Sequence, residues 1–249
     1  MREMAPAVSL ADVTISYDRH PAVHHLSLVL DKGSLTAIVG PNGAGKSSLI
    51  KALAGLIGPS QGSIDWHGTA PSEIAYLPQL TAIDEQFPMA VRDVVLMGHW
   101  RRAGAFAAIT APWRQQAEHA LAAVGLGGFG HRRFASLSAG QQQRTLFARL
   151  VVADCRVILL DEPFSAIDSR TEEDLLGLVR RWHEEGRTVI AVMHDLAQIR
   201  RHFPQTLLLA RKLIGFGATR EILNDESLRV AHGMSVAWDE HAAPCAGAA

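Results

Sequence analysis

Residues 40–47 read Gly-Pro-Asn-Gly-Ala-Gly-Lys-Ser, a run whose residue types and spacing could bind the phosphates of a nucleotide. It fits the pattern G-x-x-x-x-G-K-[ST], in which glycines let successive backbone N–H groups point at phosphate oxygens. Lys46 would add a positive charge for the β- and γ-phosphates, and the Ser47 hydroxyl would bind Mg²⁺. A glycine-rich turn that binds nothing is the alternative, but an apolar strand-like run before the loop and helical spacing after it disfavour that interpretation. The residues predicted to contact the phosphates are Gly40, Pro41, Asn42, Gly43, Ala44, Gly45, Lys46, Ser47 and Ser48.

Two carboxylates, Asp161 and Glu162, follow the apolar run 157–160, which is typical of a parallel strand that is buried on both faces. Ligands bind beyond the carboxyl ends of such strands. Asp161 is therefore placed to bind Mg²⁺, and Glu162 to orient and deprotonate an attacking water molecule. An acidic turn that caps the next helix would be the better interpretation if the pair stood alone, but the phosphate loop favours catalysis.

A third motif, Leu-Ser-Ala-Gly-Gln at 137–141, precedes a run with helical spacing at 142–152. Ser138 lies where a helix N-cap belongs, and Gly140 allows close approach of the backbone, so this helix start could bind an anion. One anion rarely needs two helix N-termini from distant parts of one monomer, which suggests a site shared between two chains. A capped helix with a polar first turn would be the interpretation of this stretch alone. The residues predicted to reach a nucleotide in the other copy are Ser138, Ala139, Gly140 and Gln141.

With these motifs, the chain resembles the ATP-binding subunit of an ATP-binding cassette (ABC) transporter from about Val8 to about Leu228. The resemblance implies a P-loop NTPase (RecA-like) α/β fold, with ATP and Mg²⁺ as cofactors. It also implies a head-to-tail homodimer, in which the signature of one copy closes over ATP held by the phosphate loop of the other. The family signature is usually Leu-Ser-Gly-Gly-Gln, and Ala139 replaces its first glycine. Because alanine tolerates a helical first turn, we expect the site to function.

The resemblance gives roles to four further residues. Tyr17 resembles the aromatic residue that stacks on adenine, and Gln79 resembles the glutamine that contacts Mg²⁺ and water and links the nucleotide to the permease. His194 resembles the histidine that contacts the γ-phosphate and holds the water of Glu162. Asp168 ends a Ser-Ala-Ile-Asp run that resembles the dimer-contact loop. A lone tyrosine or histidine is otherwise more often structural, but His194 follows an apolar run at the sheet edge already assigned to the site. The predicted catalytic residues are Lys46, Gln79, Glu162 and His194, and the predicted Mg²⁺ ligands are Ser47, Gln79 and Asp161.

The overall composition limits the partners. The 24 Lys and Arg residues and 25 Asp and Glu residues give a net charge of −1, without the basic excess of a nucleic-acid binder. Cys155 and Cys245 suggest neither a disulfide framework nor a zinc knuckle, which suits a reducing compartment. No apolar stretch reaches the roughly 18 to 20 residues that span a bilayer, and no apolar signal core begins the chain. We therefore expect no nucleic-acid partner, and a location at the cytoplasmic face of the inner (plasma) membrane through an integral membrane permease.

The residue patterns predict one ABC ATPase domain over 8–228, followed by a C-terminal tail over 229–249. Its RecA-like core is expected at about 8–83 and 154–228, with a helical signature subdomain inserted at about 84–153. The tail is small and polar and is expected to be mobile.

Local patterns support this division. Short β-rich runs over 8–77, the last of them at 74–76, predict an antiparallel β layer that leads into the core. Helical spacing at 91–99 and 113–124 predicts the inserted helices. Strands and helices alternate from residue 156 onward, which predicts a mainly parallel sheet.

The segment from Phe87 to His99 is similar to the permease-contacting segment of importers of zinc and manganese that work with a solute-binding protein. We therefore expect import of a divalent transition metal, zinc first and manganese second, with the solute-binding protein as an indirect partner. Iron-chelate and cobalamin importers are the near alternatives. A soluble ATPase of DNA repair is disfavoured, because the stretch between Gln79 and Ser138 is too short for a coiled-coil insertion, and translation ATPases usually carry two cassettes. A nucleotide-binding regulator without turnover is disfavoured by the intact Glu162 and His194.

The chain contains 12 histidines, which raise the question of a metal site. His20, His24 and His25 surround a proline, so no common helical face is expected, and a solvated loop is the better interpretation. The C-terminal candidates fit no compact site and are expected to belong to the tail; they are His232, Asp239, Glu240, His241 and Cys245. We assign no site for a transported metal to this chain.

Overall fold

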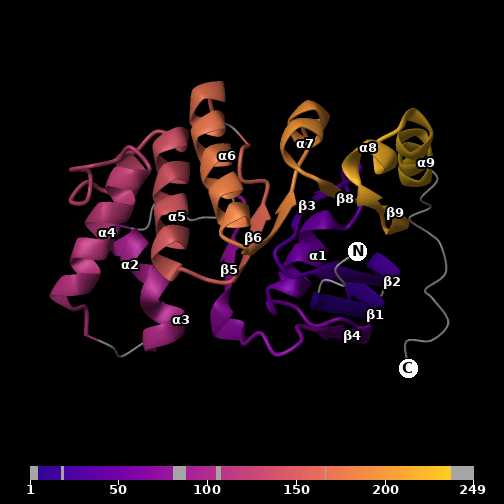
Figure 1. Ribbon diagram of the computed structural model, residues 1–249, viewed down its shortest axis with the longest axis horizontal. Coiled ribbons are helices and arrows are strands. Elements are labelled where there is room, and N and C mark those ends of the chain that lie inside the picture. The colour runs from indigo at the N-terminus through magenta and orange to yellow at the C-terminus, as the bar shows by residue number, and fades with distance from the viewer. Residues whose placement is uncertain (1–4, 18–19, 81–87, 105–107, 166, 237–249) are drawn as a thin grey trace.

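The computed structural model describes residues 5–17, 20–80, 88–104, 108–165 and 167–236. In this part of the chain a six-stranded sheet runs through the molecule, with strand order β5-β6-β7-β3-β8-β9 (Figure 1). Its strands are β3 (Leu35–Val39), β5 (Ile74–Leu77), β6 (Val157–Asp161), β7 (Thr188–Val192), β8 (Gln205–Ala210) and β9 (Lys212–Ala218). Strand β9 pairs antiparallel with β8, and the other neighbours pair in parallel. The prediction of a mainly parallel sheet is therefore confirmed.

The parallel strands are apolar because both faces of the sheet are covered. Every residue of β3, β6 and β7 is buried. Successive side chains point to opposite faces, so Ile38 packs in one core while Ala37 and Val39 pack in the other. The carboxyl ends of these three parallel strands lie at one edge of the sheet, where the phosphate loop, Glu162 and His194 follow them.

A second sheet with order β2-β1-β4 covers one face of the first. Its antiparallel strands are β1 (Pro6–Tyr17), β2 (His20–Asp31) and β4 (Gln61–Asp65). Helix α1 (Lys46–Leu53) packs against both sheets and shares a core with them. The predicted antiparallel β layer is confirmed, with one correction. Residues 74–76 do not belong to it but to β5, which pairs in parallel with β6, because a short apolar run does not itself specify its partner strand.

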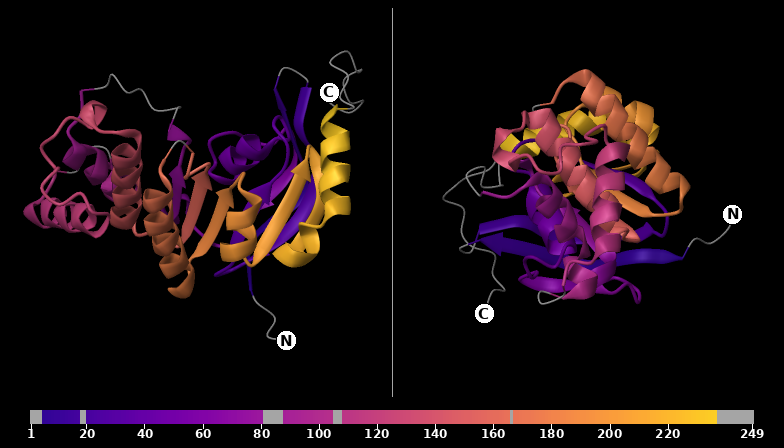
Figure 2. Two further views of the ribbon diagram at one scale, coloured as in Figure 1. Left: turned by 90° about the horizontal axis from the view of Figure 1, so that it is seen from above. Right: turned by 90° about the vertical axis from the view of Figure 1, so that its left-hand side faces the viewer.

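Helices cover the opposite face of the central sheet. Helices α6 (Ser169–Glu184), α7 (Leu196–His202) and α9 (Asp225–Val236) contribute Trp182, Ile199 and Ala231 to the core on that face. The short helix α8 (Thr219–Ile222) connects β9 to α9. Figure 2 shows α9 at one end of the molecule and the helices of the inserted segment at the other.

In the described residues of the inserted segment, the regular elements are helices joined by loops, apart from one isolated bridge between Ala90 and Arg133. Its α-helices are α2 (Val91–Leu96), α3 (Trp100–Ala103), α4 (Ala111–Ala123) and α5 (Ala139–Ala153), and 3₁₀ turns cover Met97–His99 and Phe134–Ser136. They lie beyond the β5 edge of the sheet, and α5 packs against α2 and α4 (Figure 1). A further 3₁₀ turn, Pro71–Glu73, leads into β5.

The predicted loop at His20, His24 and His25 is wrong, because these residues lie in strand β2. The apolar alternation that follows them, at Leu26, Leu28 and Leu30, buries one face of the strand and extends it back through the histidines. At His25 the backbone has a φ of 50° and the imidazole Nδ1 lies 2.7 Å from Asp12 Oδ1 on the neighbouring strand. The histidines are therefore part of the β layer.

The predicted C-terminal tail also needs a correction. Residues 229–236 continue α9, and Ala231 within them is only 2% exposed. Leu228 and Ala231 are three residues apart and face the core together, a helical pattern that the small, polar composition concealed. Residues 237–249 lie outside the described residues, as do Phe87 and Ala166.

Candidate nucleotide site

The phosphate loop turns sharply between β3 and α1. Gly45 is the N-cap of α1 and has a φ of 88°, and Gly43 has a φ of 75°. These are left-handed conformations that favour glycine. A Cβ atom at Gly45 would clash with the carbonyl oxygen of Ala22 on β2, and one at Gly40 would clash with that of Leu209 on β8. Gly45 is thus required both by its backbone conformation and by strand β2, Gly43 is favoured by its conformation, and Gly40 is required by the close approach of β8.

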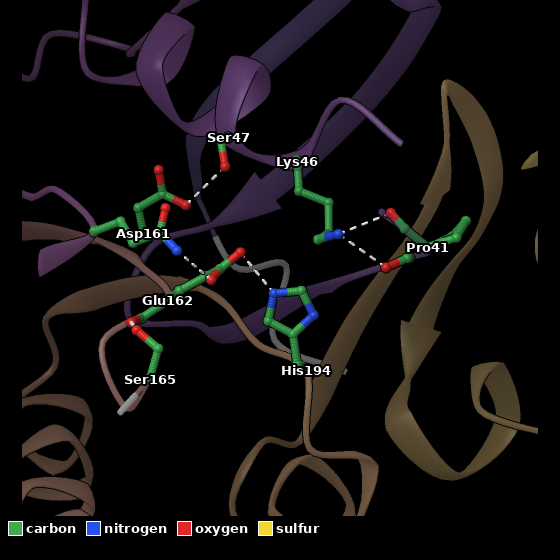
Figure 3. Close-up of polar contacts among 9 residues, drawn as sticks. Pro41, Lys46, Ser47, Asp161, Glu162, Ser165 and His194 are labelled. Carbon is green, nitrogen blue, oxygen red and sulfur yellow. Dashed lines mark hydrogen bonds and ion pairs between the residues drawn. The ribbon is translucent and has the colours of Figure 1, made fainter. Parts of the chain in front are cut away.

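Lys46 is a buried cation, with 6% of its surface exposed. Its Nζ donates hydrogen bonds to the carbonyl oxygens of Gly40 and Pro41, both at 2.9 Å (Figure 3). Burial lowers the pKa of Lys46, and the carboxylates of Glu162 and Asp161 oppose that shift. Because burial disfavours the charged form, an anion bound beside the ammonium group would stabilise it. The surroundings of Lys46 therefore suit a phosphate group.

A cavity of about 430 Å³ lies beside this lysine. It is lined by Tyr17, Ala22, Asn42, Gly43, Ala44, Gly45, Lys46, Ser47, Ser48 and Glu162. Tyr17, predicted to stack on adenine, is half exposed at 48% and borders the same cavity as the phosphate loop. The structure therefore brings together the residues predicted for both ends of the nucleotide.

Asp161 ends β6 and is 3% exposed. The Ser47 hydroxyl donates to its Oδ1 at 3.1 Å, and the Tyr76 hydroxyl donates to its Oδ2 at 3.3 Å. Burial raises the pKa of Asp161, and the hydrogen bond from Ser47 opposes this shift; burial also raises the pKa of Tyr76. The paired oxygens of Ser47 and Asp161 are the kind of ligand that Mg²⁺ prefers. Sequence reasoning assigned no role to Tyr76, although it is a hydroxyl within an otherwise apolar strand.

Glu162 contacts two other predicted catalytic residues, Gln79 and His194. Its Oε2 accepts a hydrogen bond from Gln79 Nε2 at 2.8 Å, and its Oε1 lies 2.6 Å from His194 Nε2 (Figure 3). Its backbone φ of 49° is left-handed, which is a strained conformation for a residue other than glycine. The backbone N–H and hydroxyl of Ser165 both donate to the Glu162 carbonyl oxygen, at 3.3 and 3.0 Å, and hold this turn.

The signature residues lie apart from this cavity. Ser138 is the N-cap of α5, as predicted: its Oγ accepts from the Gln141 backbone N–H at 3.3 Å, and Gln141 Oε1 accepts from the Ser138 N–H at 3.1 Å. Neither residue is among those that line the cavity of the phosphate loop. Asp168 caps α6 instead of pointing at that cavity, since its Oδ1 accepts from the Thr171 N–H at 2.9 Å. Within one chain, then, the structure does not bring the signature to the phosphate loop.

Sequence reasoning also missed two contacts of the signature helix α5. Gln143 is 2% exposed, and its Nε2 donates to the carbonyl oxygen of Pro163 at 2.6 Å, directly after Glu162. Arg144 donates to Thr171 Oγ1 at 3.2 Å and to Asp174 Oδ2 at 2.8 Å, which joins α5 to α6. Both residues continue the signature, but their partners are brought near only by tertiary folding.

Residues 23–165 match the family model for the ABC transporter. The chain belongs to the ABC transporter family. A probable metal transport system ATP-binding protein of Chlamydia pneumoniae is 38% identical, covering 92% of this chain and 90% of that protein. The manganese transport system ATP-binding protein MntB of Bacillus subtilis is 36% identical, covering 91% of this chain and 92% of that protein. The zinc transport system ATP-binding protein TroB of Treponema pallidum is also 36% identical, covering 92% of this chain and 88% of that protein.

Solved structures agree with this assignment. An ABC transporter in an inward-facing conformation superposes with a TM-score of 0.81 at 33% identity, covering 92% of this chain and 89% of that one. A dimeric ATP-binding cassette in a post-hydrolysis state with ADP and Pi gives a TM-score of 0.75 at 25% identity, covering 86% and 99%. The ABC subunit is thus a nucleotide-binding, ATP-hydrolysing protein of a kind that acts with membrane permeases. In the part of the chain that the structure describes, none of its helices has the length and apolar character needed to span a bilayer.

Proposed function

We propose that this ABC subunit hydrolyses ATP with Mg²⁺ to power a permease that imports a divalent transition metal, zinc or manganese. The observation that carries the catalytic part is the Glu162 carboxylate, held between Gln79 and His194 at the wall of the phosphate-loop cavity. The metal part is supported by relatives whose names specify manganese or zinc.

Nucleotide binding would use the cavity from Tyr17 to Lys46. The adenine ring would stack on Tyr17, and the loop N–H groups would receive the phosphates at the start of α1. The ammonium group of Lys46 would exchange the neutral carbonyls of Gly40 and Pro41 for phosphate oxygens, which compensates its burial. Ser47, Asp161 and Gln79 would hold Mg²⁺, which supplies positive charge to the phosphate oxygens.

Hydrolysis would proceed by attack of water on the γ-phosphorus. The new P–O bond forms as the bond to the β–γ bridging oxygen breaks, and the proton of the water passes to Glu162. His194 and Gln79 each hold one carboxylate oxygen of Glu162, so the base is oriented before the nucleotide arrives. Lys46 would stabilise the charge that develops on the phosphates.

We further propose that the complete site forms between two copies. The start of α5 lies outside the phosphate-loop cavity of its own chain, so Ser138, Ala139, Gly140 and Gln141 would meet the γ-phosphate held by a second copy. Asp168 would contact the second copy from the adjacent loop. The dimeric solved cassette supports this arrangement for a protein of the same fold.

The permease contact is proposed at a groove of about 230 Å³ between β5 and the inserted helices. Tyr76, Met97, Trp100 and Arg149 line it, and Trp100 is 58% exposed. An exposed tryptophan beside a groove is typical of a partner site. Docking of a permease there would place this subunit at the cytoplasmic face of the membrane, with a solute-binding protein acting on the far side.

Reconstitution in liposomes tests this function. The subunit, its permease and the metal-loaded binding protein are combined, and ATP hydrolysis and uptake are measured with zinc, manganese, ferric chelate and cobalamin. We expect uptake and stimulated hydrolysis with zinc or manganese, and the relative rates decide between the two ions. Uptake only of a chelate or cobalamin would contradict metal-ion import while leaving the ATPase in place, and export from right-side-out vesicles would contradict the direction.

A further inference from the structure

Two residues, one in β5 and one just beyond its end, contact the two site carboxylates. Gln79 donates to Glu162, and Tyr76, three residues earlier, donates to Asp161. We propose that Tyr76 is a positioning residue that fixes the Asp161 carboxylate for Mg²⁺ and couples it to the groove beside the inserted helices. This inference rests on the proposed function, in which Asp161 binds Mg²⁺.

Asp161 is held at both oxygens by donors from separate elements. Ser47, on α1, donates to Oδ1, and Tyr76, on β5, donates to Oδ2. With both oxygens occupied, the carboxylate plane is fixed and Oδ1 stays beside the Ser47 hydroxyl. Mg²⁺ demands near-ideal octahedral geometry, so a fixed carboxylate binds it better than a rotating one. Hydrogen bonds of this outer kind typically change metal affinity by about 10- to 100-fold.

Tyr76 is itself held from the side of the inserted helices. Its carbonyl oxygen accepts a hydrogen bond from Arg149 Nη2 at 3.0 Å, and Arg149 belongs to the signature helix α5. Its backbone pairs with Leu159, two residues before Asp161, in the ladder between β5 and β6. The phenol therefore reaches Asp161 from a strand whose end is fixed by α5.

The same tyrosine lines the groove proposed for the permease. Tyr76 and Arg149 share this groove with Met97 and Trp100. A partner that moves the end of β5 or the Arg149 side chain would therefore displace a donor to Asp161, together with the Gln79 donor to Glu162. Tyr76 thus adds a Mg²⁺-linked contact to the one that Gln79 makes with the catalytic base.

The test is Tyr76→Phe in the subunit reconstituted with its permease. Phenylalanine keeps the ring and lacks the hydroxyl, so the strand and groove are preserved while Asp161 Oδ2 loses its donor. We expect the Mg²⁺ concentration for half-maximal ATPase to rise about 10-fold or more, with the maximal rate largely restored at saturating Mg²⁺. With a non-hydrolysable ATP analogue bound, titration calorimetry should show that the variant binds Mg²⁺ about 10-fold or more weakly than wild type, independently of turnover. Permease stimulation of hydrolysis, measured at saturating Mg²⁺, should also fall.

Thr206→Val is the matched control. Thr206 is a fully buried residue of strand β8, away from Asp161. Its hydroxyl lies 2.9 Å from the hydroxyl of Thr219. The Thr206→Val variant loses a buried hydroxyl that does not contact the Asp161 carboxylate. The Mg²⁺ dependence of its ATPase activity should therefore equal that of the wild type. The same Mg²⁺ dependence in Tyr76→Phe and wild type, or an equal shift in both variants, would overturn the inference. A wild type that hydrolyses ATP without Mg²⁺ would instead contradict the proposed function.

Discussion

At the scale of single residues, the site keeps conformations that stability alone would not favour. Glu162 has a left-handed backbone, and Asp161 is a carboxylate whose pKa burial raises. Each such feature costs on the order of 1 to 3 kcal/mol, so the surrounding contacts must maintain it. Ser165 and Gln143 hold the backbone of this turn through the consecutive carbonyl oxygens of Glu162 and Pro163. The carboxylates of Asp161 and Glu162 are thus held in position at the expense of local stability.

Glu162→Gln tests the base directly. The amide keeps the shape of the side chain but accepts no proton, so ATP binding should persist while kcat falls by at least ~10²-fold. The variant should also form a stable dimer in ATP and Mg²⁺, because hydrolysis no longer separates the two copies. Phosphate-release assays measure the fall in kcat, and size-exclusion chromatography in ATP and Mg²⁺ measures the dimer. Near-normal turnover, with no ATP-dependent dimer, would remove Glu162 from this role.

His202 predicts a dependence of stability on pH. His202 is 8% exposed, and its pKa is lowered mainly by burial and next by the positive charge of Arg180. The charge of Arg201 lowers this pKa further, whereas the carboxylate of Glu173 raises it. As pH falls through about 6.5, the unfolded histidine takes up a proton that the folded one resists, so the free energy of unfolding should decrease. Chemical denaturation from about pH 7.5 to about pH 5.5 should show a smaller loss for His202→Gln than for wild type. Exposed His119→Gln is the control, and a wild-type slope in both variants would contradict the prediction.

At the scale of elements, helix α5 has two functions. Its first turn carries the signature, and its second turn holds the catalytic loop through Gln143 and the α6 cap through Arg144. In addition, Phe147 stacks on Phe164 with ring centroids 6.2 Å apart. A change at the signature therefore reaches the Glu162 turn of the same chain through one rigid helix.

Gln143→Leu and Gln142→Leu form a matched pair on this helix. Gln143 donates to Pro163 O beside Glu162, whereas Gln142, also buried at 4%, donates to Phe134 O at 3.4 Å away from it. Each substitution leaves a carbonyl without its donor and should lower the free energy of unfolding by about 1 to 3 kcal/mol. Only Gln143→Leu should also lower kcat, with little change in KM for ATP. Equal kcat values for the two variants would show that Gln143 has no catalytic effect.

Local sequence patterns predicted the elements better than their partners. The phosphate loop and the Ser138 cap depend on a few consecutive residues, so their geometry could be predicted from spacing. The hydrogen bond from Tyr76 to Asp161 could not, because it requires that β5 pair with β6, and the whole inserted helical segment separates these two strands in the sequence. The strand at His24 was missed because burial of the leucines that follow it outweighed the weak β propensity of the histidines.

At the scale of the whole molecule, the signature lies with the inserted helices at one end, whereas the phosphate loop lies in the middle of the sheet. The inserted helices, which include α5, lie beyond the β5 edge, whereas α1 and the phosphate loop follow β3 further along the sheet (Figure 1, Figure 2). Two copies arranged head to tail would bring each signature to the other phosphate loop. The same arrangement would place both sites in one interface, so nucleotide binding and dimer formation should depend on each other.

Complementation between two inactive variants tests this arrangement. Ser138→Arg places a long cation at the start of α5, so it should abolish hydrolysis while ATP still binds to the variant's own phosphate loop. Lys46→Ala should be inactive because its loop lacks the phosphate-binding cation. A mixed dimer, however, contains one site in which the intact loop of Ser138→Arg meets the intact signature of Lys46→Ala. ATPase activity should therefore reappear on mixing and rise with protein concentration, as measured by phosphate release. If the mixture were no more active than its separate components, or if Ser138→Arg alone hydrolysed ATP normally at every protein concentration, each chain would have to complete its own site.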